Sequence, residues 1–203
     1  MKNKKGRKCI AIGMLLMVAA LFLTMYNLYE NQMAGERAWQ VTKELDEYYA
    51  KLLEADAQED QLIPMYKQNP GMEMPIYSVG GYDYIGLLEI PSCELRLPVL
   101  SDWDYGKLKH APCRYSGSAY TDNMVIAAHN YRSHFSKIKN IAQGSKIIFT
   151  DVDGNIFRYQ VLDREILDPE QVEEMKNGDW DLSLFTCGPG GTYRIAVRCI
   201  LEE

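Results

Sequence analysis

Residues 182–200 have the sequence LSLFTCGPGGTYRIAVRCI, which contains two short runs of strand-forming residues separated by a turn. Leu182 to Thr186 and Tyr193 to Ile200 are rich in aliphatic, aromatic and β-branched residues, whereas Gly188 to Thr192 between them is rich in glycine. Runs bounded in this way are typical of two successive strands joined by a tight loop. The pattern places Cys187 at the end of the first strand.

The rest of the C-terminal part predicts further short strands and few helices. Asp151 to Asn155 contains an Asp-Gly pair, which predicts a tight hairpin between the runs on either side of it. Pro169 to Lys176 predicts a short helix with Asp168 as its N-cap. The other expected strands are Tyr84 to Ile90, Leu95 to Leu100, Met124 to Ala128, Lys146 to Thr150 and Ile156 to Leu162. Seven or eight short strands favour a mostly β fold, a small closed β-barrel.

The N-terminus combines a basic tail with a long apolar run. Five lysines and arginines lie in residues 1–8, and residues 9–29 form a run long enough to span a bilayer. A signal peptide is the alternative, but its apolar core is shorter and ends at a small-x-small site, whereas residues 25–29 here are Met-Tyr-Asn-Leu-Tyr. We therefore expect a single-pass transmembrane anchor, with a cytoplasmic N-terminus and residues 30–203 outside the cell.

Composition divides the remainder into three parts. Residues 30–57 are rich in Ala, Glu, Leu and Lys and predict a helical stalk that lifts the domain off the membrane. Prolines and glycines interrupt residues 58–81, which predicts a linker without regular structure. Residues 82–203 have a normal size for one hydrophobic core and should form the β-barrel domain.

Charge excludes one class of partner. The chain has 22 basic and 28 acidic residues, and all the acidic ones lie from Glu30 onward with 17 of the basic ones, so that part carries −11. Nucleic-acid binding needs clustered lysine and arginine. We therefore expect no nucleic-acid partner.

The cysteines do not indicate a disulfide framework or a zinc site. They number five and no two have the C-x2-C spacing. His110 and Cys113 are the nearest approach to a metal half-site, but no second half-site has matching spacing. Cys199 lies among aliphatic residues and should be a small buried hydrophobe. We expect no metal and no cofactor.

Three groups of a thiol acyl-transfer site occur at predicted strand ends. His129 follows the apolar run that ends at Ala128, and Arg194 comes seven residues after Cys187. A thiol supplies the nucleophile, an imidazole carries protons, and a guanidinium stabilises an anion and favours the thiolate. Together they predict an enzyme in which Cys187, His129 and Arg194 are catalytic.

These residues resemble the signature blocks of a known family. Ala128-His129, Ser183 to Cys187 and Tyr193 to Ile195 are similar to the three conserved blocks of the sortases, membrane-anchored cysteine transpeptidases of Gram-positive bacteria. The family pattern at the nucleophile is Thr-Leu-x-Thr-Cys, and Ser183 keeps a hydroxyl where the first threonine stands. The resemblance covers Tyr84 to Glu203 in order and spacing, and it implies a sortase-like barrel with short helices.

The resemblance implies a reaction and its partners. Cys187 would attack the threonine carbonyl of a surface protein's sorting signal of Leu-Pro-x-Thr-Gly type and form a thioester. His129 would protonate the leaving amine and then deprotonate an incoming amine of a peptidoglycan precursor, which anchors the surface protein to the cell wall. Arg194 would hold the substrate and the oxyanion, and Thr186 and Ala128 would contact the substrate.

Other readings of the same residues remain. A papain-like cysteine hydrolase would use the same groups, but its nucleophile usually precedes its histidine. A non-catalytic, membrane-tethered extracellular binding domain would need none of them. His110 and His134 are expected at the surface, with His134 as the fallback base. Arg198 should share a face with Arg194, which makes it the comparison residue for that position.

The class within the family stays open. In the family that this chain resembles, members that polymerise pilins usually carry a second apolar segment at the C-terminus and an Asp-Pro-aromatic lid before the barrel. No such segment follows Leu201 and no such triplet precedes the barrel here, so the resemblance favours wall anchoring over pilus assembly. The acidic stretch from Asp163 to Asp181 should help to shape the substrate groove. Some sortases bind calcium nearby, but no Asp-x-Asp-x-Asp-Gly spacing occurs here, so calcium is not indicated.

Overall fold

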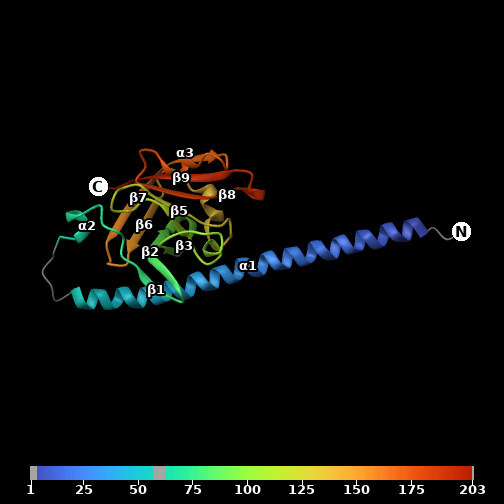
Figure 1. Cartoon of the computed structure of the whole chain (residues 1–203), viewed down its shortest axis with the longest axis horizontal. Helices are drawn as coiled ribbons and strands as arrows, with labels where there is room; N and C mark the ends of the chain where they lie inside the picture. The colour runs from blue at the N-terminus through green and yellow to red at the C-terminus, as the bar shows by residue number, and fades with distance from the viewer. Residues whose placement is uncertain (1–3, 57–62, 203) are drawn as a thin grey trace.

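The structure is a computed structural model that describes residues 4–56 and 63–202, a β-barrel mounted on one long helix (Figure 1). Eight of the nine strands form a closed ring in the order β2-β3-β4-β5-β8-β9-β7-β6, and β6 pairs with β2. The strands are β1 (Tyr77–Val79), β2 (Tyr82–Ile90), β3 (Leu95–Leu100), β4 (Cys113–Ser116), β5 (Met124–Ala127), β6 (Lys146–Asp151), β7 (Ile156–Leu167), β8 (Leu182–Cys187) and β9 (Arg194–Leu201). The predicted closed barrel is confirmed.

The helices are few and mostly short. They are α1 (Lys4–Asp56), α2 (Met65–Gln68), α3 (Val172–Lys176) and the 3-10 turns η1 (Pro91–Cys93), η2 (Lys107–Lys109), η3 (Phe135–Asn140) and η4 (Pro189–Gly191). The predicted helix at 169–176 exists but starts later, at Val172. Gln171, and not the predicted Asp168, is therefore the residue that precedes it. The Gln171 side-chain oxygen instead accepts a hydrogen bond from the Asp168 backbone N–H, at 2.8 Å.

Closure of the barrel depends on a close approach of two backbones. Gly86 on β2 has φ +153°, and a Cβ placed on it would lie 2.0 Å from the carbonyl oxygen of Thr150 on β6. Only glycine, with no side chain, lets the two strands meet at this point. The neighbouring β6–β7 hairpin is the one that the Asp-Gly pair predicts, and Asp151 accepts hydrogen bonds there from the backbone N–H groups of Asp153 and Asn155.

Parallel pairing of β5 with β8 builds the end of the barrel that matters for function. Met124 lies opposite Leu182 and Ala127 opposite Phe185, so the two chains leave the sheet at the same edge. Both strands are buried over most of their length, as their continuous apolar runs predict. The residues that follow them, His129 and Cys187, therefore emerge at one end of the barrel.

Two strands were not predicted, and one extends beyond its predicted end. β4 is short and contains Arg114 and Ser116, so its sequence lacks an apolar run, and it is held by pairing with β5. β7 continues past Leu162 to Leu167 because it pairs with β9 along its whole second half. Exposed residues at 162–164 hide this continuation in the sequence.

The region predicted as a linker is partly regular. Residues 57–62 lie outside the described residues, but α2 and β1 fall within 58–81, and β1 pairs with β2. Met74 is buried, and the Tyr66 ring stacks on Tyr120 with centroids 4.7 Å apart. The prediction of a segment without regular structure is therefore wrong for residues 65–68 and 77–79.

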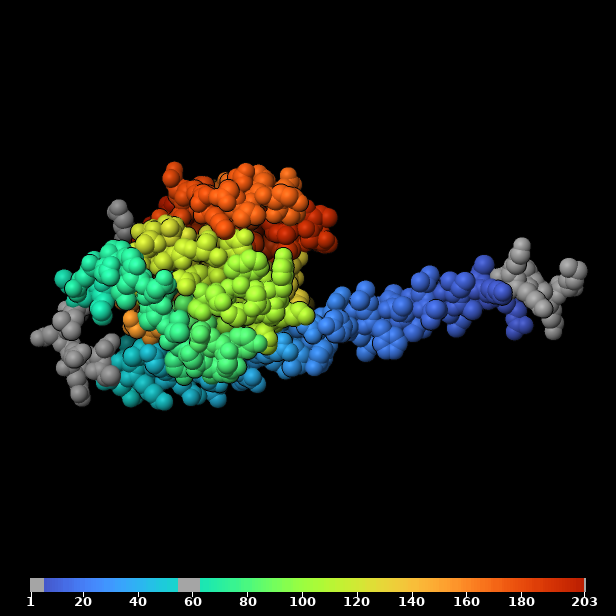
Figure 2. All heavy atoms as spheres, viewed as in Figure 1, coloured from blue at the N-terminus to red at the C-terminus, as the bar shows by residue number. Residues whose placement is uncertain are grey.

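The long helix α1 is continuous through both the apolar run and the predicted stalk. Its N-terminal half projects free of the barrel, and its C-terminal half lies along β2 and β3 (Figures 1 and 2). The most apolar 18-residue window has a mean hydropathy of 2.4 and none of it is buried, which fits a membrane anchor or a signal sequence. Ala34, Ala38 and Leu45 are buried against the barrel. The predicted helix over this stretch is therefore present, but its described residues pack along the barrel instead of standing apart from it.

Candidate active site

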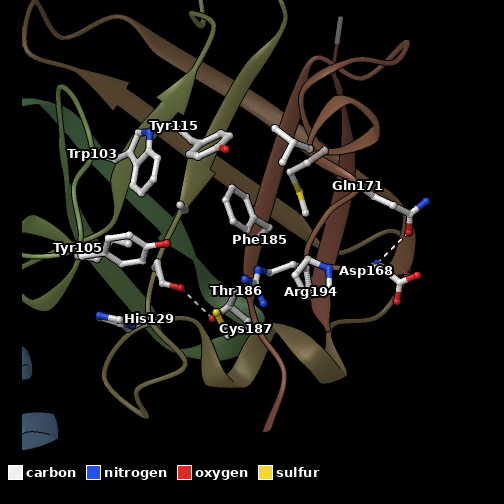
Figure 3. Close-up of a pocket in the computed structure, with 16 residues that line it drawn as sticks. Trp103, Tyr105, Tyr115, His129, Asp168, Gln171, Phe185, Thr186, Cys187 and Arg194 are labelled. Atoms are coloured by element: carbon white, nitrogen blue, oxygen red, sulfur yellow. Dashed lines mark hydrogen bonds between the residues drawn. The ribbon is translucent and has the colours of Figure 1, made fainter. Parts of the chain in front are cut away.

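Cys187 and Arg194 face one another across two neighbouring strands. Cys187 ends β8, Arg194 begins β9, and the two are paired directly in the antiparallel register. Both side chains are half-buried. Figure 3 shows the Arg194 guanidinium directed toward the Cys187 sulfur. The prediction that a cation accompanies this thiol therefore has a geometric basis.

The loop between these strands holds the arginine in place. Arg194 Nη1 donates hydrogen bonds to the carbonyl oxygens of Gly191 and Tyr193, at 3.1 and 3.2 Å. The backbone N–H of Gly188 donates to the Tyr193 carbonyl at 2.9 Å, and a Cβ on Gly188 would lie 2.3 Å from the Tyr193 ring. The residue after the nucleophile must therefore be small, and the guanidinium is left with donors free to bind an anion.

His129 reaches the same end of the barrel from β5. The Ala128 backbone N–H donates to the Phe185 carbonyl at 3.1 Å, which extends the β5–β8 pairing up to the histidine. The His129 ring lies against Tyr131, with centroids 4.8 Å apart. Figure 3 shows the imidazole on the opposite side of Cys187 from Arg194, without pointing at the sulfur.

The environment of His129 favours a neutral imidazole. Burial lowers its pKa from the usual value near 6.5, the nearby Lys109 lowers it further, and Glu30 partly opposes them. A neutral imidazole accepts a proton at neutral pH, which suits a base that takes the proton of a thiol or an amine.

A pocket of about 220 Å³ leads to these residues. One wall is aromatic and was not predicted: the Tyr115 ring lies 4.9 Å from Trp103 and 5.1 Å from Phe185, and Tyr105 lies beside them (Figure 3). The Asp-Trp-Asp-Tyr sequence at 102–105, two large aromatic residues in a loop, was the signal that could have revealed it.

The opposite wall comes from the acidic segment before β8. Asp168, Gln171, Val172 and Met175 line the pocket from the end of β7 and from α3. The expectation that residues 163–181 help to shape the groove therefore agrees with the arrangement.

The two residues predicted to contact substrate lie in the pocket wall. Thr186 and Ala128 both line it, but the Thr186 hydroxyl donates to the Ala128 carbonyl at 2.8 Å (Figure 3). This hydrogen bond joins β8, which ends at Cys187, to Ala128, the residue before His129. A substrate hydrogen bond from Thr186 would have to compete with this internal bond.

The remaining thiols are poor nucleophiles or lie far from the pocket. Cys93, Cys113 and Cys199 are buried, and burial raises the pKa of all three, that of Cys113 to about 12. The prediction that Cys199 is a buried hydrophobe is confirmed. Cys9 lies on the apolar part of α1. Among residues 4–56 and 63–202, no group of three His, Cys, Asp or Glu side chains is placed to hold a metal ion.

The other two histidines are not simple surface residues. His110 is half-buried and shares a hydrogen bond of 2.8 Å with the Tyr82 hydroxyl. His134 is fully buried, so its predicted surface position is wrong. Neither of its ring nitrogens makes a hydrogen bond of normal geometry. Burial lowers the pKa of His134 to about 4, with a further lowering by His129 and a partial offset by the Ala34 backbone.

This burial predicts that stability falls in mild acid. The folded protein keeps His134 neutral while the unfolded chain binds a proton near pH 6.5, so stability is lost as the pH falls from there toward 4. Between pH 7.5 and 5 the free energy of unfolding should drop by about 2 kcal/mol from this group. Urea unfolding at both pH values measures it. The change of the free energy of unfolding with pH should become smaller in His134→Leu and should alter much less in His110→Asn. An unchanged pH dependence in His134→Leu would contradict the assignment to His134.

Arg198 shares the outer face of β9 with Arg194, as expected, but it is a buried structural residue. It donates hydrogen bonds to Glu165 at 2.8 Å, to the Ser183 hydroxyl at 2.9 Å, and to the carbonyls of Met175 and Glu174. Its side chain joins β9 to β7, β8 and α3. It therefore cannot serve as a neutral comparison for Arg194.

Replacing Arg198 with alanine should destabilise the fold. The change leaves the buried carbonyls of α3 and the Ser183 hydroxyl without their donor, and we expect a loss of about 3 kcal/mol in the free energy of unfolding. Denaturant unfolding compares Arg198→Ala with Arg158→Ala, an exposed arginine on β7. A loss below about 0.5 kcal/mol in Arg198→Ala, the range of ordinary surface changes, would show that the network does not stabilise the fold.

Comparisons with known proteins identify a family and a fold. The profile of the sortase family, described as "Sortase domain", matches residues 88–202. No curated protein sequence matches the chain. Among solved structures, a sortase D5 transpeptidase of Clostridium perfringens has a TM-score of 0.58 at 19% identity. The matched region covers 81% of this chain and 99% of the chain in that structure.

Two further sortase structures show the same fold. Sortase A of Corynebacterium diphtheriae has a TM-score of 0.54 at 18% identity and covers 89% of this chain and 95% of its own. The sortase C1 of Streptococcus suis has a TM-score of 0.52 at 24% identity and covers 59% of this chain and 73% of its own. At these identities the structures support the fold alone.

Proposed function

The chain belongs to the sortase family of cysteine transpeptidases, and on this premise we propose that it cleaves a sorting signal of Leu-Pro-x-Thr-Gly type and transfers the surface protein to a cell-wall amine. Cys187 is the nucleophile, His129 the proton carrier and Arg194 the anion donor. The observation that carries the proposal is that these three half-buried groups line one pocket.

The first half-reaction forms a thioester. The proton of the Cys187 thiol passes to neutral His129, and the sulfur attacks the threonine carbonyl carbon. Arg194 donates hydrogen bonds to the oxygen that gains the negative charge. When the intermediate collapses, the C–N bond breaks and the imidazolium gives its proton to the leaving amine.

The second half-reaction repeats these steps with an incoming amine. His129 removes a proton from the amine as it attacks the thioester, and the Cys187 thiolate leaves. The pocket supports amine transfer over hydrolysis because its walls are mainly aromatic and aliphatic, so bound substrate displaces water from the thioester. The pocket's apolar walls suit the leucine and proline of the proposed signal.

The apolar half of α1 supports a membrane location. We assign it as a single-pass anchor with its basic end in the cytoplasm, which places the barrel outside the cell. A wall-anchoring role fits this arrangement, with a peptidoglycan precursor as the source of the amine. The alternatives, a thiol hydrolase and a catalytically silent binding domain, become outcomes of the test.

The test measures how the products divide between transfer and hydrolysis. The full chain in detergent is mixed with sorting-signal peptides, and amide and acid products are separated at rising concentrations of a glycine-based amine. We expect the amide to rise with amine while the acid falls. Acid formation that is indifferent to amine would identify a hydrolase, and the absence of any cleavage across the peptide set would support a binding domain.

A further inference from the structure

The helix α1 runs along the barrel from the end that carries His129 to the opposite end. Near Asn31 the helix touches the loop that carries His129, and near Tyr49 it touches β6 at the other end. The helix rises about 1.5 Å per residue, so these two contacts are about 27 Å apart along its axis. The barrel is therefore mounted on α1 with a defined end toward the apolar run.

Direct bonds fix the end nearest the apolar run. The Arg132 backbone N–H donates to the Asn31 side-chain oxygen at 2.8 Å, and the Ser133 hydroxyl donates to the Asn31 carbonyl at 3.1 Å. Gly35 lies so close that a Cβ there would be 3.1 Å from Ser133. The His129 loop and this part of α1 thus form one packed unit.

A charge on α1 acts on His129 and on two of its neighbours in this part of the barrel. Glu30 partly offsets the burial that lowers the pKa of His129 and of His110. The pKa of Tyr131 is raised by burial, then by Glu30 and by Tyr26. The hydrogen bond from Arg132, the residue after Tyr131, to Asn31 places this loop two residues beyond the end of the apolar run.

Contacts at the other end are equally defined. Arg96 on β3 forms a two-pronged ion pair with Asp46 at 2.5 Å. Leu45 packs with Val152 of the β6–β7 hairpin, and the Tyr49 hydroxyl donates to the Thr150 carbonyl at 3.1 Å. These contacts join the barrel to α1 at a second place, far along the helix from Asn31.

We infer that the active-site end of the barrel rests against the outer surface of the membrane. The inference rests on the proposed function and its anchor, because the apolar run 9–29 must stay in the bilayer. Asn31 follows the run by two residues, a rise of about 3 Å, and no break occurs in α1 between them. The loop after His129 therefore meets the lipid headgroups, while the β6–β7 hairpin points away (Figures 1 and 2).

The exposed side chains at this end suit a headgroup surface. Tyr105 is 77% exposed on a loop that lines the active-site pocket, and Lys109 and Arg132 are exposed nearby. Tyr26 and Tyr29 lie at the end of the apolar run. Tyrosines and basic side chains are favoured at the boundary between hydrocarbon and water. The partner of this surface is the bilayer itself.

This placement has a consequence for the substrate. Cys187 is held at the membrane-facing end, so the enzyme handles a scissile bond close to the bilayer. A donor whose scissile bond lies a few residues from a membrane-embedded segment is presented at high effective concentration. A membrane-embedded donor whose scissile bond lies far along the chain from its embedded segment loses this advantage in effective concentration.

Fluorescence quenching tests the orientation without requiring turnover. In full-length protein carrying Cys9→Ser and Cys187→Ala, a bimane label is attached at Lys109→Cys or at Asp153→Cys, both exposed positions. The protein is placed in liposomes containing a lipid with a nitroxide on its headgroup. We expect at least a threefold greater quenching at position 109 than at 153. Equal quenching, or greater quenching at 153, would overturn the inference.

An insertion tests the consequence for catalysis. Seven helix-forming residues (AEAAAKA) between Tyr29 and Glu30 raise the barrel by about 10 Å with nearly the same helical phase. We expect turnover of a soluble signal peptide to stay within twofold, and turnover of the same peptide joined by a short spacer to a transmembrane helix to fall at least tenfold. The same seven residues placed before Lys4 are the control.

The outcomes separate the two proposals. Loss of the membrane-presented reaction alone supports the inference, and equal retention of both reactions overturns it. If the unmodified protein turns over neither substrate, the proposed function fails while the quenching result still decides the orientation.

Discussion

Replacing Cys187 with alanine should lower turnover by about ten-thousand-fold or more and abolish thioester formation. The sulfur is the atom that bonds to the substrate carbonyl, and the other barrel thiols are buried with raised pKa values, so none can replace it. Folding should be unaffected because Cys187 is only half-buried at a strand end. Single-turnover kinetics and thermal unfolding measure the two effects.

The matched control for this change is Cys9→Ser. Cys9 lies exposed on the apolar half of α1, so its thiol plays no part in the barrel chemistry. Turnover in Cys9→Ser should equal that of the unmodified chain. Residual turnover within a hundredfold in Cys187→Ala, with the fold intact, would remove Cys187 from the role of nucleophile.

Replacing Arg194 with alanine should lower kcat by about a hundredfold to a thousandfold, the usual effect of losing one preorganised oxyanion donor. The guanidinium is directed toward Cys187 and is anchored by the carbonyls of Gly191 and Tyr193. Arg194→Lys keeps the charge but loses the planar fork, so it should recover only part of the rate. Steady-state kinetics with a fixed signal peptide provide the measurement.

One control and one comparison variant accompany the arginine experiment. Arg158→Ala changes an exposed arginine on β7 and should leave kcat within twofold. Arg198→Ala should destabilise the fold, yet the rate per folded molecule should fall less than in Arg194→Ala. A few-fold effect of Arg194→Ala would assign that residue a structural role, and greater sensitivity at Arg198 would contradict the assignment of the anion donor.

The sequence predicted the barrel well because its strands carry local signals. The run 182–186 is rich in aliphatic, aromatic and β-branched residues, a glycine-rich loop follows, and the Asp-Gly pair at 153–154 marks the hairpin between β6 and β7. The cross-strand pairing of Cys187 with Arg194 follows from the loop length between them. These signals act over a few residues, so they can be recognised without knowledge of the tertiary structure.

The docking of α1 had no local signal. Ala34, Ala38 and Leu45 have helical spacing, which predicts a helix, but nothing near them in the chain identifies the surface that they contact. The partners of α1, such as Arg96 for Asp46, lie far along the chain. The sequence therefore predicted a stalk, whereas packing makes this helix part of the domain.

The sequence predicted the reactive groups of the site but not the residues that surround them. Cys187, His129 and Arg194 have chemistry and spacing that can be recognised in sequence, and their roles remain proposals. The burial of His134 under α1 and the network around Arg198 depend on contacts between distant elements. The aromatic wall formed by Trp103 and Tyr115 arises in the same way, from a loop folding over β4.

The most direct test of the central claim is the intact mass of the full-length protein after mixing with a sorting-signal peptide. The account predicts an adduct equal to the peptide's acyl portion, located on Cys187 by digestion, which disappears when a glycine-based amine is added while the amide product forms. A folded protein that never gains mass with any signal peptide, or an adduct that persists in the presence of amine, would contradict transfer through a thioester at Cys187.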